Sequence, residues 1–211
     1  MAREAATAIQ RGLSSNPLAQ CDGFRKVFVN VVQRDFASFA ANRWQPLRDA
    51  STARRIWICL HLLLSSRLLG VLLYRLKVWA LDAHLPVLPQ LCDRLAILLF
   101  DVNLGNHARI GGGLYLPHGN VVVDGIVHIG RNCVIAPWVT VGVVESVAGP
   151  TIGDDVYIGT GAKILGNIRI GDSVRVGANA VVLEDVPANV TVAGVPARVV
   201  RRHEVDAGPT P

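Results

Sequence analysis

The fold is decided by one stretch in the second half of the chain, IGDDVYIGTGAKILGNIRIGDSVRVGANAVV, residues 152–182. An aliphatic residue returns at every sixth position of this stretch, and Gly follows most of these residues. A small or branched residue stands two places before the next aliphatic one. No helix has a six-residue period, whereas the short strands of a parallel β-helix repeat at this interval. The stretch therefore predicts a stack of β-helical coils.

The same six-residue interval continues upstream, with two interruptions. It passes through Ile110, Leu116, Val122, Ile129, Ile135 and Val141. One extra residue stands between Val122 and Ile129, and five extra residues separate Val141 from Ile152. We expect the aliphatic residues to point inward and to pack on their counterparts in neighbouring coils. Residues 143–150 are expected to leave the coils as an excursion loop, the usual location of function in a regular solenoid.

The first hundred residues have a helical pattern instead. Apolar residues recur at helical spacing over 24–36, over Leu68–Leu81 and over Leu88–Phe100, and Ser51-Thr52 can cap a helix that begins near Ala53. The predicted fold is therefore α+β and mainly β. It comprises a helical domain over 1–100, a β-helix over 101–187 and a closing segment with a tail over 188–211.

Composition narrows the function classes. The chain has a net charge of +5, but no basic run exceeds two residues and no aromatic residues interleave with the cations. This pattern argues against nucleic acid and fits a small phosphorylated ligand held by a few arginines. The most apolar stretch, Ile56–Leu64, is too short to span a membrane, and the N-terminus lacks the apolar core of a secretory signal. We expect a cytoplasmic protein without a membrane span.

The four cysteines lie far apart and form no Cys-x-x-Cys pair. They are expected to be reduced core residues, with neither a zinc site nor a disulfide framework.

His118 is the histidine best placed for chemistry. It follows Gly111–Pro117 on an early coil and is flanked by Pro117 and Gly119, which are both turn residues. An imidazole on a rigid coil edge can take up a proton near neutral pH. By position alone, a catalytic base and a hydrogen-bonded structural histidine both remain open.

Three motifs together resemble the serine acetyltransferases of the hexapeptide acyltransferase superfamily. They are Gly111-Gly-Gly-Leu-Tyr-Leu-Pro-His118-Gly119, Ile158-Gly-Thr-Gly-Ala-Lys-Ile-Leu-Gly-Asn167, and Val186-Pro-Ala with Ala193-Gly-Val-Pro-Ala-Arg198. The likeness covers residues 68–202, and its motifs agree in order and spacing.

The resemblance implies a left-handed β-helix that forms a homotrimer, or a dimer of trimers. Acetyl-CoA would lie in the groove between two subunits, and no metal is expected. His118 would be the general base that activates an acceptor hydroxyl for direct attack on the thioester. The family's donor contacts fall on Gly142, Thr160, Ala178, Arg175 and Arg198. Trp138, in the coil before the excursion, could line the acceptor pocket or form a subunit contact.

The chain departs from the family where acceptors bind. The Asp that orients the family's histidine is replaced by Asn103, so either Asn103 or, with a shift of the chain, Asp101 would orient His118. Serine-type members carry an Asp before the histidine and an Arg-His pair in the long loop. Here these positions hold Pro117 and Ala148-Gly149. The groups that would hold a zwitterionic amino acid are therefore missing.

These departures leave three functions open. The first expectation is an acetyl-CoA-dependent O-acetyltransferase acting on a hydroxyl of a small molecule or saccharide. Its alternative is a true serine O-acetyltransferase, and a further alternative is a non-catalytic β-helix scaffold. A γ-type carbonic anhydrase on the same fold needs three metal-binding histidines, and the repeats from Ile110 to Val182 offer only His118 and His128, which argues against it.

Overall fold

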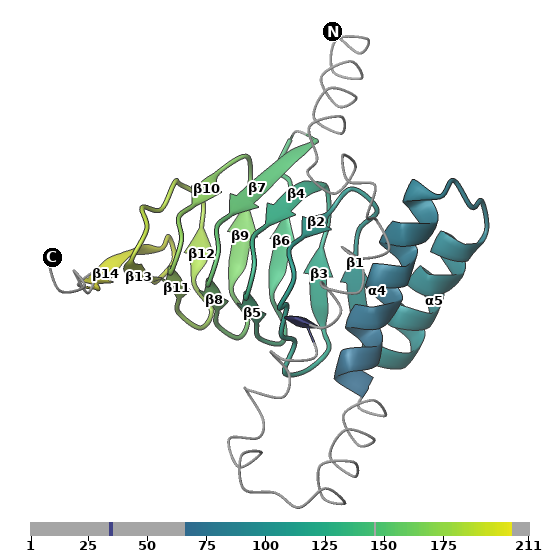
Figure 1. Ribbon diagram of the computed structural model, residues 1–211. Coiled ribbons are helices and arrows are strands. Elements are labelled where there is room, and N and C mark those ends of the chain that lie inside the picture. Colours follow the sequence, from purple (N-terminus) through teal and green to yellow (C-terminus); the bar gives the residue numbers. More distant parts are fainter. Residues whose placement is uncertain (1–33, 36–65, 146, 204–211) are drawn as a thin grey trace, which may run out of the picture.

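Two helices lead into a stack of parallel coils (Figure 1). The computed structural model describes residues 34–35, 66–145 and 147–203. Helix α4 spans Ser66–Asp82 and helix α5 spans Leu88–Phe100. These bounds confirm the helices expected over 68–81 and 88–100. The helices expected over 24–36 and from Ala53 lie, apart from residues 34–35, outside the described residues.

The strands form three sheets, here named A, B and C. Sheet A contains β1 (Val102–Leu104), β3 (Val121–Val123), β6 (Thr140–Gly142), β9 (Lys163–Leu165) and β12 (Val181–Val182) in that order. Sheet B contains β2 (Arg109–Ile110), β4 (Ile126–Ile129), β7 (Ala148–Ile152) and β10 (Arg169–Ile170). Sheet C contains β5 (Val134–Ile135), β8 (Tyr157–Ile158), β11 (Arg175–Val176), β13 (Val190–Ala193) and β14 (Arg198–Arg202).

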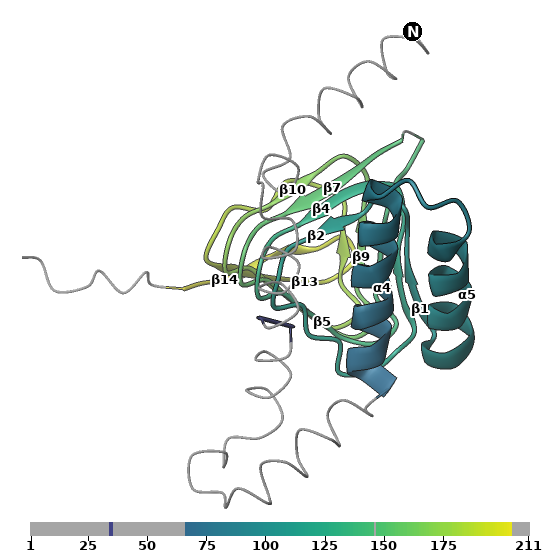
Figure 2. The same cartoon turned by 45° about the vertical axis from the view of Figure 1, so that its right-hand side comes forward.

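Each coil visits the three sheets in turn, so that its strands pair with those of the coils before and after it. Pairing is parallel throughout, except that β14 returns antiparallel to β13 at the far end of the stack. Figure 2 shows the coils more nearly end-on, with α4 and α5 packed beside β1 at the opposite end. This arrangement confirms the predicted order of helices followed by a parallel β-helix.

Aliphatic side chains stack in three internal columns, one behind each sheet. Along sheet B, for example, the register aligns Ile110, Ile129, Ile152 and Ile170, all of them buried. Burying such a side chain stabilises the fold by roughly 1.5–3 kcal/mol. The columns therefore confirm the inward direction expected for the repeated residues.

One position of the predicted repeat is wrong. Val122 is 39% exposed, and Val121 and Val123 point inward instead. Val123 is the residue that aligns with Val141 of the next coil. The extra residue of the repeat therefore lies before β3, between Leu116 and Val123, and not after it.

The excursion is shorter than expected. Only residues 143–147 separate β6 from β7, and Ala148-Gly149-Pro150 belong to β7. The five-residue β7 pairs with β4, which has four residues, with a register shift between Ile126 and His128. Because β4 offers this additional partner, the last residues of the inserted segment, Ala148–Pro150, continue the sheet rather than form a loop.

Candidate functional site

His118 lies at the corner where the chain passes from sheet C to sheet A. Tyr115 forms the last bridge to sheet C, and β3 begins at Val121. The extra residue of the repeat falls inside this corner, which widens the turn and brings His118 to the surface. Its side chain is exposed, whereas Leu114 and Leu116 before it are each only 1% exposed. A buried segment thus holds an accessible imidazole.

Both residues expected to orient His118 lie on the preceding turn of the chain. Asp101 ends helix α5 in a left-handed conformation (φ 52°), and its carbonyl accepts a hydrogen bond of 3.2 Å from the Val121 N–H. Asn103 is exposed in the middle of β1 and pairs in register with Val122. Within the described residues, the His118 ring makes no hydrogen bond to either side chain. Either group therefore remains available to orient it.

The sheet C to sheet A corner continues down the stack from His118. Backbone hydrogen bonds join its turns in sequence: the Trp138 N–H to the Asn120 carbonyl (2.8 Å), the Gly161 N–H to Pro137 (2.9 Å) and the Asn179 N–H to Thr160 (2.8 Å). The residues Asn120, Trp138, Gly161 and Asn179 all have positive φ, between 56° and 75°. We call this continuous edge the His118 edge.

The residues expected to contact the acyl donor divide into two groups. Thr160 and Ala178 are exposed on the His118 edge, and Arg198 follows its last turn, where it pairs with Glu184 at 3.2 Å. Arg175 is exposed on sheet C beside that edge. Gly142 is buried at the end of β6, on the other side of sheet A, so the structure does not bring it to the same edge.

Trp138 is unusual on this edge. Its φ of 66° is one that Asn and Gly tolerate and that bulky residues rarely adopt. The side chain is 61% exposed, so contacts within the chain do not offset this strain. Lys163 Nζ donates a hydrogen bond of 2.7 Å to the Trp138 carbonyl and thereby fixes the turn. One coil below His118, Trp138 therefore combines a strained backbone with an exposed indole.

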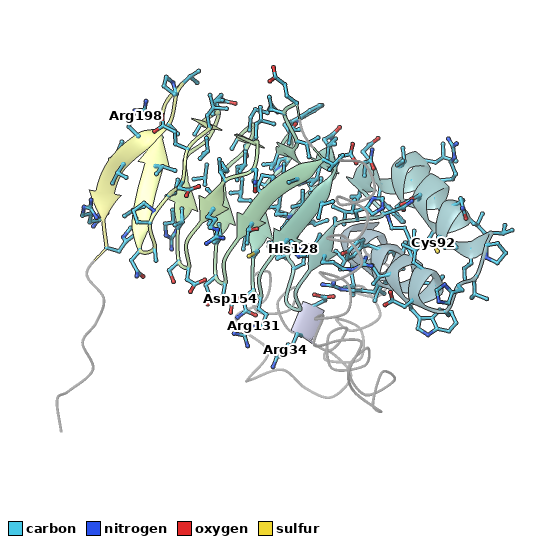
Figure 3. The ribbon with its side chains drawn as sticks, turned by 90° about the horizontal axis from the view of Figure 1, so that it is seen from above. Arg34, Cys92, His128, Arg131, Asp154 and Arg198 are labelled. Carbon is cyan, nitrogen blue, oxygen red and sulfur yellow. The ribbon has the colours of Figure 1, made fainter. Side chains whose placement is uncertain are left out.

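The corner between sheets B and C holds a structural ion pair and none of the predicted site residues. Arg131 donates to Asp154 from its Nε at 2.9 Å, and its backbone N–H donates to the same carboxylate at 2.7 Å (Figure 3). These bonds hold the pKa of Asp154 below its ordinary value. Cys133 is buried next to this corner, and burial raises the pKa of its thiol to about 12. Cys133 is therefore a core residue, as expected.

A buried polar cluster closes the helical end of the β-helix. It consists of Tyr74, Arg75 and Lys77 from α4 together with Asp35, and all four side chains are less than 10% exposed. We call it the end cluster. Residues 34–35 appear as the short purple segment beside the first coils in Figure 1. No local sequence pattern indicates Asp35, because its partner in the cluster, Arg75, lies 40 residues away in the chain.

Other kinds of site find little support in the part of the chain that the structure describes. No helix among these residues is long and apolar enough to cross a membrane. The same residues contain no group of three or more His, Cys, Asp or Glu side chains that could hold a metal ion.

A family model described as bacterial transferase hexapeptide (six repeats) matches residues 149–184. Two curated relatives are both serine acetyltransferases. The protein of Synechococcus elongatus is 41% identical over 140 residues, which cover 64% of this chain and 57% of that protein. The protein of Helicobacter pylori is 35% identical over 160 residues, which cover 74% of this chain and 92% of that protein. The chain thus spans little more than half of some relatives and nearly all of others.

The chain is also similar to solved structures of serine acetyltransferases. The serine acetyltransferase of Neisseria gonorrhoeae in complex with serine has a TM-score of 0.69 at 32% identity, covering 81% of this chain and 68% of that one. The serine acetyltransferase of Brucella abortus in complex with coenzyme A has a TM-score of 0.70 at 28% identity, covering 91% and 71%. The repeat, the fold and these relatives agree, and the chain belongs to the serine acetyltransferase family of hexapeptide-repeat acyltransferases.

Proposed function

We propose that this protein transfers the acetyl group of acetyl-CoA to the hydroxyl of serine, with His118 as the general base. The observation that carries the proposal is the exposed imidazole of His118 at the head of a continuous edge of coil corners. Thr160 and Ala178 follow on that edge, and these are residues at which the family contacts its acyl donor.

The reaction needs one proton acceptor and no covalent enzyme intermediate. His118 removes the proton from the acceptor hydroxyl as its oxygen attacks the thioester carbonyl. The tetrahedral intermediate collapses, the carbon–sulfur bond breaks, and His118 returns its proton to the departing CoA thiolate. Cys133 is excluded as a nucleophile, because its thiol is buried and its pKa is raised to about 12.

The orienting group distinguishes this protein within the proposed mechanism. An Asp beside the histidine would stabilise the imidazolium through its charge, whereas Asn103 can hold the tautomer only through its amide oxygen. Asp101 lies beside the His118 turn, because its carbonyl accepts a hydrogen bond from the Val121 N–H and its Cβ would be 3.3 Å from a Cβ added at Gly119. We propose that one of these two side chains orients the ring.

The relatives favour serine over the other hydroxyl acceptors expected from the sequence. One solved relative is a complex with serine, and another is a complex with coenzyme A. A different hydroxyl metabolite or a saccharide remains the second candidate, because Pro117 and Ala148-Gly149 stand where the family has charged groups. These substitutions predict weaker ground-state binding of serine than a fully charged pocket would give.

We also propose that the working form is a homotrimer in which the acyl donor lies between two subunits. The exposed positions on the His118 edge and the exposed Arg175 and Arg198 would then face the donor from one side of the groove. Analytical ultracentrifugation of the full chain tests the assembly, and a monomer that is fully active would contradict it.

An acceptor panel tests the proposed function. CoA release from acetyl-CoA is measured with L-serine, L-homoserine, glycerol and amino sugars, and the products are identified by mass spectrometry. The proposal predicts the highest kcat/KM with L-serine and O-acetylserine as the product. A higher kcat/KM with a sugar would shift the assignment to the second candidate, and no acyl transfer to any acceptor would overturn both.

A further inference from the structure

The first coil of a β-helix has a structural problem that the later coils lack. Its backbone N–H and C=O groups on the outer side have no preceding coil to bond, and buried groups of this kind destabilise a fold unless they find partners. In the second coil, by contrast, the Asn132 N–H bonds to the carbonyl of Gly112 in the first coil at 2.9 Å. The equivalent group of the first coil is the N–H of Gly113.

Side chains of helix α4 supply partners for several of these groups. The Tyr74 hydroxyl donates to the Ala108 carbonyl at 3.0 Å and accepts from the Ile110 N–H at 3.2 Å. Lys77 donates to the carbonyl of Leu104, the residue after Asn103, and to Asp93 of α5 at 2.6 Å. These side chains project from one face of α4 and bond the free edge of the first coil.

Arg75 extends this capping toward Gly111, at the turn that precedes residues 113–119. We call residues 113–119 the His118 segment. One of the terminal nitrogens of Arg75, Nη1, donates to the Ile110 carbonyl at 2.5 Å, and the other, Nη2, donates to the Gly111 carbonyl at 2.6 Å. Its Nε donates to Asp35 Oδ2 at 2.8 Å. A planar guanidinium can make these bonds at once, which an ammonium group on the same stem cannot.

Asp35 completes the cap. Its Oδ1 accepts from the N–H of Gly113 at 2.7 Å and from the N–H of Leu114 at 2.9 Å, and the side chain is fully buried. The carboxylate thus joins the backbone four residues before His118 to helix α4 through Arg75. A buried charge in this position is stable only while its partners remain in place.

We propose that the Asp35–Arg75 pair is a positioning device for His118 and not only a structural cap. The pair fixes Gly113 and Leu114, and the buried Leu114 and Leu116 carry that position to the exposed imidazole. Lys77, from the same helix, holds β1 next to Asn103. Helix α4 therefore fixes the position of the His118 segment relative to β1, the strand that carries the candidate orienting residue Asn103. This proposal rests on the proposed function, in which His118 acts as the base.

The chain offers a matched control. Asp154 accepts one corner N–H at 2.7 Å through Oδ1 and the Nε of Arg131 at 2.9 Å through Oδ2, a pattern similar to that of Asp35, whose Oδ1 accepts two N–H groups. It lies on the sheet B to sheet C corner of a later coil, where the Arg131 side chain is 58% exposed. Asp154→Asn removes an arginine-paired carboxylate charge, at a more exposed position, without touching the His118 segment.

The test compares Asp35→Asn and Asp35→Ala with Asp154→Asn, using acetyl-CoA and the best acceptor of the panel. We expect Asp35→Asn to lower kcat by about 10- to 100-fold, because a small misplacement of a catalytic group has effects of this size. The KM for acetyl-CoA should change little, since Thr160 and Ala178 lie on later coils. Asp35→Ala should lower kcat further, because Asn can still accept the two N–H bonds.

Two results would overturn the proposal. One is a kcat for Asp35→Asn equal to that of the wild type, and the other is an equal loss in Asp154→Asn. If Asp35→Asn does not fold, Arg75→Lys carries the same test, because it keeps the buried positive charge but loses the guanidinium fork. A wild type without activity would contradict the proposed function instead, which keeps the two failures distinct.

A second readout does not depend on turnover. The imidazole signals of His118 and His128 are followed by NMR in the wild type and in Asp35→Asn. His128 is exposed on β4 and serves as the internal reference (Figure 3). The positioning role predicts a shifted or broadened signal for His118 alone. Unchanged signals from both rings would contradict it.

Discussion

The backbone of Gly119 lies directly against the carbonyl of Phe100, and the gap leaves no room for a side chain. A Cβ added at Gly119 would overlap the Phe100 oxygen and would stand 3.3 Å from the Cβ of Asp101. Phe100 ends helix α5, and Gly119 follows His118. The end of helix α5 can therefore approach the turn that carries His118 only because residue 119 has no side chain.

Gly119→Ala should therefore impair activity strongly, because the added methyl group pushes the His118 corner away from the end of α5. We expect a lower kcat together with a lower midpoint of thermal unfolding, since the overlapping atom belongs to the backbone and cannot rotate away. Steady-state kinetics and thermal denaturation measure the two effects.

Gly166→Ala is the control for this substitution. Gly166 has a φ of +93° but nothing within 4 Å of an added Cβ, so that only backbone strain opposes the change. It should lower stability by roughly 1 kcal/mol while kcat remains that of the wild type. Equal kcat values for Gly119→Ala and the wild type would show that the contact with Phe100 does not position His118.

Trp138→Asn should separate stability from activity. Asn tolerates a φ of 66° better than Trp, and an indole that is 61% exposed contributes little burial within the chain. We expect the free energy of unfolding to stay the same or to rise by up to about 1 kcal/mol, whereas kcat/KM falls. Chemical denaturation and kinetics on the same preparation measure both quantities.

Asn179→Ala provides the opposite change on the same edge. It introduces strain at a φ of 56° and should lower the stability of the protein. If Trp138→Asn proves markedly destabilising, the indole has contacts that offset the strain, and the argument from its exposed conformation is wrong.

The Arg131–Asp154 pair predicts a pH-dependent contribution to stability. Hydrogen bonds from Arg131 hold the pKa of Asp154 below its ordinary value of 3.8. A carboxylate with a lowered folded pKa stabilises the fold above its unfolded pKa, and this stabilisation is lost as the pH falls through the folded value. Asp154→Asn should therefore be less stable than the wild type at neutral pH, and the difference should narrow below about pH 3.8.

The size of this effect should be small and sensitive to salt, because both side chains of the pair are accessible to solvent. Urea denaturation across a pH series at two salt concentrations measures it. A stability difference that is constant from neutral to acidic pH would show that the carboxylate's charge does not contribute.

Cys133 should be inert in the folded protein. Burial raises the pKa of its thiol to about 12, so almost none of it is thiolate at neutral pH. Iodoacetamide at about pH 8 should label Cys133 only after denaturation, as mapped by peptide mass spectrometry. Rapid labelling in the native state would mean that the coils open at this position.

Much of the fold could be predicted from the repeat, because a buried column tolerates only aliphatic residues at a fixed interval. The extra residue before β3 escaped the prediction, since Val121, Val122 and Val123 are all valines and only the pairing of Val123 with Val141 settles which one is outside. The strand character of Ala148–Pro150 escaped as well, because it depends on the matching extension of β4.

The candidate site divides in the same way. His118 could be proposed as a candidate base from its local motif and its turn residues, and the structure shows that its side chain is exposed. The role of Asp35 depends on Arg75 and on the backbone of Gly113, which lies 78 residues away along the chain, so no local pattern indicates it. The separation of Gly142 from Thr160 and Ala178 likewise appears only when the coils are stacked.

The most direct test of the account is the rate of serine-dependent CoA release by the wild type and by His118→Ala, with His128→Ala as the control for loss of an exposed histidine. If His118 is the general base, His118→Ala should lose about 100-fold or more of the wild-type kcat, while its unfolding midpoint and that of His128→Ala stay unchanged. A His118→Ala protein that releases CoA at the wild-type rate would contradict that role.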